Sequence, residues 1–174
     1  PLSPAAGSSP SEQRLFNCPR LSAIDVPVGV ESIGMNAFDG CLLSRVSLPE
    51  GLETIGAYAF EAANPDLSLP DSVTDLGRGA FLDCDQLEAI TLPSALDRIV
   101  PELFSGCAAL ESVTMGEGHR SVGTGQFYEC TALSGLSLPG SVKVVGNEAF
   151  YNCSSLQTLI LSKQSDLRSV RVLL

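Results

Sequence analysis

The stretch Phe81–Pro93, FLDCDQLEAITLP, decides the fold, because it returns along the chain at an almost constant interval. Its first residue recurs at steps of 21 to 23 residues, and every phenylalanine of the 174-residue chain takes part. A repeat of this period is typical of a solenoid, in which each short unit stacks on the next. The repeated phenylalanines are Phe16, Phe38, Phe60, Phe81, Phe104, Phe127 and Phe150.

Each unit combines a strand, a bend and a corner. Apolar and polar residues alternate in Ile90-Thr91-Leu92, which is the period of a strand with one buried face. Pro93 ends this strand, because proline has no N–H to donate to a ladder. Phe81, Cys84 and Leu87 have the spacing of one face of a helical or 3-10 turn, so we predict such a turn at the corner. Stacking should place phenylalanine on phenylalanine along the array.

Two motifs recur through the chain: A-F-x-x-C, as in Ala80–Cys84, and L-x-x-I-x-L-P, as in Leu87–Pro93. With them the chain resembles the BspA-like leucine-rich repeat family over about residues 16–161. The resemblance implies a parallel sheet on the concave side and short, partly strand-like segments on the convex side. It also implies a surface-associated adhesion or protein-binding module, and therefore a cell-surface or extracellular location. An organelle, reached after removal of a targeting segment, is the alternative.

We therefore predict an α/β solenoid, a right-handed leucine-rich-repeat coil of about seven laps. Residues 1–14 are rich in proline, serine and alanine and are predicted to form a flexible leader. Residues 15–161 form the predicted solenoid. Residues 162–174 lack the proline and phenylalanine of the repeat, so we predict an irregular C-terminal half-repeat or cap there.

The composition excludes several classes of partner. The net charge of −10 and the pI near 4.4 disfavour nucleic acid, whose phosphates require a basic surface, and disfavour an anionic membrane surface. No apolar run approaches the roughly 18 residues that a spanning helix needs. We expect a protein partner, with a glycan and a place in a large complex as alternatives.

The six cysteines follow the repeat instead of a disulfide framework. Four of them recur every 23 residues at one corner position, which is Ala63 in the third lap. Stacked parallel side chains suit a disulfide poorly, and no C-x-x-C metal motif is present. We predict buried thiols that act as small apolar groups, and no metal or cofactor. Cys18, in the first lap, is the least certain of the set, which otherwise comprises Cys41, Cys84, Cys107, Cys130 and Cys153.

One lap is irregular. His119 occupies a position that is valine or leucine in the other laps, while Met115, Gly116 and Gln126 replace leucine, proline and alanine. One interpretation is a local binding spot or a bulge. The favoured one is a core histidine that is bound by the backbone, or one turned outward by Gly116 and Gly118. A single histidine without a nucleophile beside it does not support hydrolytic catalysis, so we predict that the protein is not an enzyme.

The outward residues of the strands form a polar column, with a hydroxyl in five consecutive laps about 4.8 Å apart. One interpretation is the ordinary preference of strands for small β-formers. The other is a docking strip for an extended peptide, a glycan or another protein. We call this column the strip; it comprises Asp25, Ser47, Ser68, Thr91, Thr114 and Ser137, with Arg45 and Asp66 beside it.

The repeats and the absence of a catalytic constellation predict a non-catalytic protein–protein interaction module, adhesin-like or a scaffold, that binds through the repeat surface. The alternative is a structural subunit of a larger multiprotein assembly. Such a subunit would dock through its N-terminal leader, through an open C-terminal sheet edge, or through both.

Overall fold

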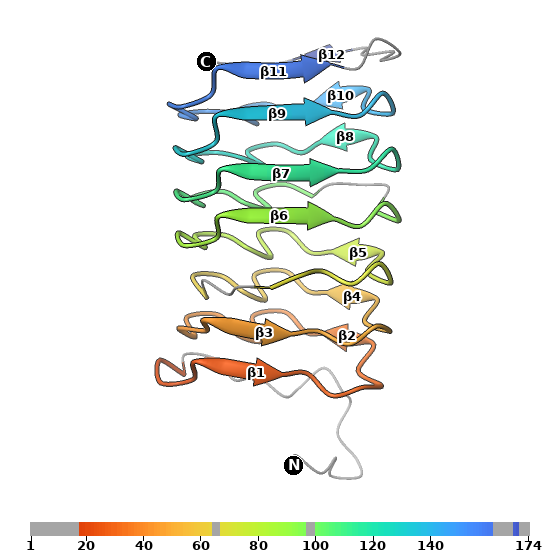
Figure 1. Ribbon diagram of the computed structural model, residues 1–174, viewed down its shortest axis with the longest axis vertical. Helices are drawn as coiled ribbons and strands as arrows, with labels where there is room; N and C mark the ends of the chain where they lie inside the picture. Colours follow the sequence, from red (N-terminus) through yellow and green to blue (C-terminus); the bar gives the residue numbers. More distant parts are fainter. Residues whose placement is uncertain (1–17, 64–66, 97–99, 162–168, 171–174) are drawn as a thin grey trace.

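Alternating apolar and polar residues build a stack of parallel strands on one face of the molecule, which we call the strand face (Figure 1). The fold is seen in a computed structural model that describes residues 18–63, 67–96, 100–161 and 169–170. The strands pair in parallel as β1 with β3, β6 with β7 and β9 with β11. Their bounds are β1 (Ala23–Asp25), β3 (Arg45–Ser47), β6 (Ala89–Leu92), β7 (Ser112–Met115), β9 (Gly135–Leu138) and β11 (Thr158–Leu161).

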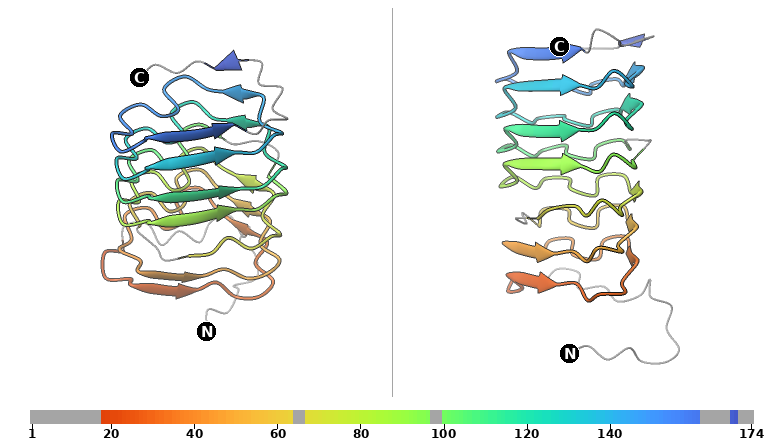
Figure 2. Two further views of the ribbon diagram at one scale, coloured as in Figure 1. Left: turned by 45° about the horizontal axis from the view of Figure 1, so that its top comes forward. Right: turned by 45° about the vertical axis from the view of Figure 1, so that its right-hand side comes forward.

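A second set of short strands lies later in the laps and stacks along a separate face (Figure 2). These strands form two parallel sheets of three strands, in the orders β2-β4-β5 and β12-β10-β8. β2, β4, β5, β8 and β10 each contribute one buried apolar residue, such as Ile55, which lies in register with Ile33 and Leu76. The bounds are β2 (Ser32–Ile33), β4 (Thr54–Ile55), β5 (Asp75–Leu76), β8 (Ser121–Val122), β10 (Val144–Val145) and β12 (Ser169–Val170).

The structure is a parallel β-solenoid of about six turns, somewhat fewer than the predicted seven, and Phe16 of the first predicted lap lies outside the described residues. The helical or 3-10 turns predicted at the corners are wrong, because no helix occurs in the part of the chain that the structure describes. The reason is visible around Phe104, where Glu102 and Gly106 have positive φ angles of 59° and 76°. A left-handed residue on each side of phenylalanine prevents a continuous right-handed helix.

The corners are instead bonded from lap to lap. The Phe104 N–H donates to the Gln126 carbonyl at 3.0 Å, and the Gly106 N–H donates to the Tyr128 carbonyl at 2.8 Å. The same lap-to-lap hydrogen bonds recur at the other corners, for example from the Phe38 N–H to the Ala59 carbonyl at 2.8 Å. Each corner therefore satisfies its buried backbone groups by binding its neighbour, which no single lap could do alone.

A stack of phenylalanine rings fills the core beside these corners. Neighbouring rings from Phe38 to Phe150 are stacked, with centroids 5.2 to 5.8 Å apart and planes inclined by 2° to 21°. All six rings are buried. The expected packing of phenylalanine on phenylalanine is confirmed for the described laps.

The cysteines of the corner are buried thiols, as predicted, from Cys41 to Cys153. In four laps the Sγ donates to the carbonyl of the phenylalanine one lap earlier, for example from Cys107 to Phe81 at 3.1 Å. Burial raises the pKa of the Cys107 thiol well above its ordinary value and that of Cys153 to about 11. These thiols are therefore poor nucleophiles near neutral pH. Cys18 is partly exposed.

The predicted leader, residues 1–14, lies outside the described residues, as does most of the predicted cap at 162–174. Within that cap, Ser169 pairs with Val144, and Val170 pairs with Val145. This pairing adds β12 to the second sheet. No helix among the described residues is long and apolar enough to cross a membrane.

Candidate functional site

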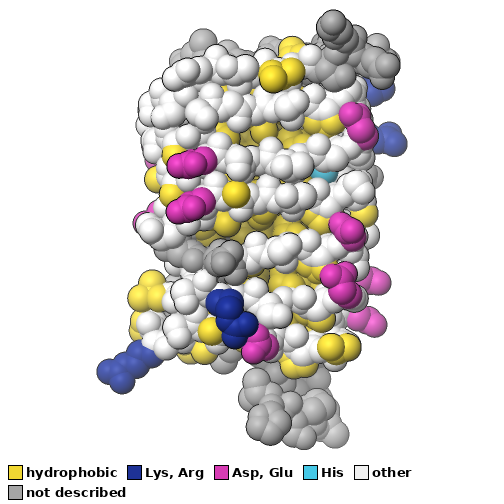
Figure 3. Space-filling view, in the orientation of Figure 1, with side chains coloured by type: hydrophobic (Ala, Val, Ile, Leu, Met, Phe, Trp, Pro, Cys, Tyr) yellow, Lys and Arg dark blue, Asp and Glu magenta, His cyan; other side chains and the backbone are white. Residues whose placement is uncertain are grey.

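The strip lies on the strand face, and every one of its residues is exposed. Parallel register places its members side by side in pairs, as Asp25 with Ser47 and Thr91 with Thr114. Ser137 lies beside Ile160, which is 55% exposed. Asp66, predicted to flank the strip, lies outside the described residues. Figure 3 shows that the middle of this face is mostly uncharged, with Lys, Arg, Asp and Glu gathered at its sides and lower part.

The strand face is interrupted at the third lap. No backbone hydrogen bond among the described residues joins 67–69 to β3 or β6, although the equivalent residues of the other laps form strands. The sequence gives a reason, since Phe60 and Pro70 are ten positions apart, whereas the other laps take eleven or twelve. The leucine that opens the strand motif elsewhere is Asn64 in this lap. This lap therefore differs from the others in the length of its corner and in one column of the repeat.

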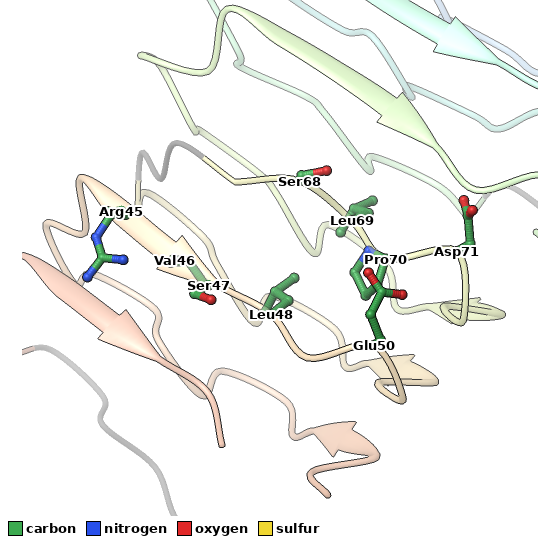
Figure 4. Close-up of a pocket in the computed structure, with 9 residues that line it drawn as sticks. All are labelled: Arg45, Val46, Ser47, Leu48, Glu50, Ser68, Leu69, Pro70 and Asp71. Carbon is green, nitrogen blue, oxygen red and sulfur yellow. The ribbon is translucent and has the colours of Figure 1, made fainter. Parts of the chain in front are cut away.

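A groove of about 540 Å³ lies between β3 and this third lap. Its accessible lining is mainly polar, while Val46, Leu69 and Pro70 are buried beneath it and Leu48 is half-buried. In Figure 4 the Arg45 side chain lies at one end, and Glu50 and Asp71 lie at the other, with the serine hydroxyls between them. The groove is lined by Arg45, Val46, Ser47, Leu48, Glu50, Ser68, Leu69, Pro70 and Asp71. The structure thus brings three of the predicted residues, Arg45, Ser47 and Ser68, into one concavity.

The two ends of the groove differ in charge. At one end, Arg45 Nη1 lies 3.0 Å from Asp25 Oδ1, in an ion pair whose side chains are 60% and 70% exposed. Solvent screens such a pair, so it holds Arg45 weakly. At the other end, Glu50 and Asp71 are exposed and form no ion pair with any described residue. The groove therefore offers a weakly held cation at one end and two uncompensated carboxylates at the other.

Sequence analysis missed Glu50 and Asp71. Each follows the proline that ends a strand, at a position occupied by valine, serine, glutamate and glycine in other laps. A comparison of this column could have found the two consecutive carboxylates. It could not have found the groove, because the groove depends on how the third lap pairs in space.

The irregular lap contains a core histidine, as favoured above. His119 and Gln126 are both fully buried in an otherwise apolar core. His119 Nδ1 lies 2.9 Å from the Gly116 carbonyl, so Nδ1 carries the proton and Nε2 the lone pair. The Gly123 N–H donates to Gln126 Oε1 at 2.7 Å. The Nε2 atoms of His119 and Gln126 have no hydrogen-bond partner among the described residues. The lap is thus a polar defect in the core, and its polar groups do not reach the surface.

The defect should make stability depend on pH. Burial lowers the pKa of His119 because the imidazolium would lose its hydration, and the Gly116 carbonyl offsets part of this effect. The unfolded histidine, with an ordinary pKa of about 6.5, therefore takes up a proton before the folded one does. The free energy of unfolding should be constant above that value and should fall as the pH decreases below it. His119→Leu should remove this loss, as shown by urea unfolding between pH 7.5 and 5.5.

The comparison of the two proteins at each pH supplies the control. Burial and the charges of Asp39 and Asp83 raise the pKa of Glu61, which favours the fold as the pH decreases. This opposite contribution is common to both proteins and cancels in the difference between them. A difference that stays constant with pH would contradict a neutral buried His119.

The described residues contain no group of three or more His, Cys, Asp or Glu side chains arranged to hold a metal ion. His119 has no nucleophile hydrogen-bonded to its ring in the described part of the chain.

Stacked parallel laps, a phenylalanine core and an exposed polar strip define a solenoid repeat protein. The sequence matches the model of the BspA-type leucine-rich repeat region, in six copies over residues 11–65 and 63–170. The chain belongs to this family. No curated protein matches it.

Solved structures show the same architecture. A leucine-rich repeat protein from Bacteroides ovatus is 26% identical with a TM-score of 0.79, over 86% of this chain and 39% of that one. The T. pallidum leucine-rich repeat protein is 26% identical with a TM-score of 0.53, over 82% and 68%. The pneumococcal vaccine antigen PcpA is similar in fold, at 21% identity and a TM-score of 0.65, over 87% and 43%. The chain spans about two-fifths of the length of the Bacteroides ovatus and pneumococcal proteins.

Proposed function

We propose that the protein is a non-catalytic interaction module that binds a protein partner through its strand face. The observation that carries this proposal is the exposed strip, whose members lie in register where strands pair, as in β1 with β3 and β6 with β7, and which lines the groove at Ser47 and Ser68. Small hydroxyl side chains leave the face accessible to an extended chain, and their oxygen atoms can donate and accept hydrogen bonds. Membership of a repeat family supports this proposal, because stacked repeats present extended binding surfaces.

The proposal can be tested with peptides selected from a displayed random library on the immobilised chain. Arginine at Ser68, Thr91, Thr114 or Ser137 would place a long charged side chain across the strip. Each substitution should lower the affinity of the selected peptides at least about tenfold, because it blocks close approach to the strands.

Thr124→Arg is the matched control. Thr124 is exposed and follows β8 of the second sheet, so an arginine there adds the same charge away from the strand face. It should leave the affinity unchanged. Equal binding to the strip variants and to Thr124→Arg would overturn the proposal.

A second candidate function is a structural subunit of a larger assembly. It is favoured by β11, where Ile160 is 55% and Leu161 43% exposed, and which pairs only with β9 among the described strands. A sheet edge that pairs with no further described strand and carries exposed apolar residues can add another strand. The mass of the native particle decides between the two: a stable mass far above 18.2 kDa favours the assembly, and a mass near that value favours the interaction module.

A further inference from the structure

We propose that the groove between β3 and the third lap binds an extended peptide segment that places a Lys or Arg over Glu50 and Asp71 and an Asp or Glu near Arg45. This inference rests on the proposed function, because it names the partner chemistry of one part of the strand face. It assigns a position and a charge pattern that the rest of the strip does not carry.

The shape of the groove suits an extended chain. Arg45 and Glu50 are five residues apart, which is about 16 Å in extended backbone. The half-buried Leu48 and the buried Leu69 lie between them. Ser47 and Ser68 line the groove, and their hydroxyls make no hydrogen bond to any described residue. A segment of about six residues could place an apolar side chain against Leu48 and backbone amides near both serines.

The charges give the segment a preferred composition. The edge that follows the groove, residues 49–55 and 70–76, carries Glu50, Glu53, Asp71 and Asp75 and no Lys or Arg. Figure 3 shows Asp and Glu side chains gathered at the lower right of this face, with no Lys or Arg among them. The field at this end therefore attracts a cation. At the opposite end, an acidic residue of the partner could replace Asp25 beside Arg45, because that exposed pair is weak.

The same charges disfavour other ligands. A nucleic acid or another polyanion would meet the carboxylates of Glu50 and Asp71. A neutral oligosaccharide could bind the serines, but its affinity would not depend on these carboxylates. A charged peptide is the ligand whose affinity depends on both ends of the groove at once.

Two blocked hexapeptides of equal composition test the proposal: Asp-Val-Ser-Val-Ser-Lys and Val-Ser-Asp-Lys-Val-Ser. The first peptide separates its two charges by the length of the groove, and it is also tested with its sequence reversed. The second peptide places the two charges next to each other in the middle. Titrations are followed by amide chemical shifts, which should change at residues 45–50 and 67–71. Of the forward and reversed end-charged peptides, the one that binds more tightly should bind about five- to tenfold more tightly than the peptide with central charges. Glu50→Gln with Asp71→Asn should abolish this advantage.

The matched control is Glu111→Gln with Glu117→Gln, which removes the same charge from exposed positions outside the groove and should preserve the advantage. Equal affinities for the two charge patterns, equal effects of the two double variants, or no binding of the end-charged peptides would overturn the inference. The proposed function is tested separately. Selected peptides that lose affinity on Thr114→Arg but ignore Glu50 and Asp71 would leave the proposed function standing without the inference. Peptides that ignore every strip variant would overturn the proposed function and, with it, the inference.

Discussion

Phe104→Ala should lower the free energy of unfolding by about 4 kcal/mol. The Phe104 ring is fully buried and lies between two others, 5.7 Å from Phe81 and 5.8 Å from Phe127. Its removal leaves a cavity in the middle of the ring stack and weakens the contacts of that lap with both neighbours. The lap-to-lap backbone bonds at this corner limit how far the cavity can collapse. Urea unfolding, followed by circular dichroism, measures the loss.

Two further variants calibrate this result. Phe104→Leu retains most of the apolar volume and should cost less than half as much. Tyr151→Ala removes a ring that is 41% exposed and stacked on Tyr128 at 4.9 Å, and should cost about 1 kcal/mol. If Phe104→Ala were no more costly than Tyr151→Ala, the ring stack would not be the main source of stability in these laps.

The repeat could be predicted because each lap repeats the same physical requirement. Phenylalanine, cysteine and the strand residues return at fixed spacing, and the structure buries them as the pattern indicates. The corner could not be predicted in the same way. The spacing of Phe81, Cys84 and Leu87 also fits a helical turn, and only the positive φ angles at positions such as Gly79 and Asp83 exclude one. Those angles are stabilised by bonds to the next lap, which a local pattern does not show.

Part of the candidate site could likewise be predicted from the sequence, and part could not. The outward direction of Ser47 and Ser68 follows from strand alternation, so sequence analysis could place them on one face. The groove follows from a difference between laps, since the corner before Pro70 is shorter and no backbone hydrogen bond among the described residues joins 67–69 to β3. A repeat pattern shows the residues that the laps share, whereas the groove depends on the corner in which the third lap differs from the others.

Gly77→Ala should destabilise the protein by about 2 to 3 kcal/mol. A Cβ at Gly77 would lie 2.1 Å from the Ala57 nitrogen and 2.5 Å from the Gly56 carbonyl carbon, both in the backbone of the previous lap. Backbone atoms cannot rotate away as a flexible side chain can, so the two laps would have to separate. Separation would stretch the bond from the Gly77 N–H to the Ile55 carbonyl, which is 2.7 Å long. Thermal unfolding of the variant measures this loss.

Gly51→Ala is the matched control, because a Cβ there meets nothing within 4 Å and its φ is not in the left-handed range. It should be neutral or stabilising by less than about 1 kcal/mol, through the reduced entropy of the unfolded chain. The contrast between these two positions measures how far glycine at position 77 sets the approach of its lap to the previous one. Equal stability of Gly77→Ala and Gly51→Ala would show that the laps can separate at little cost.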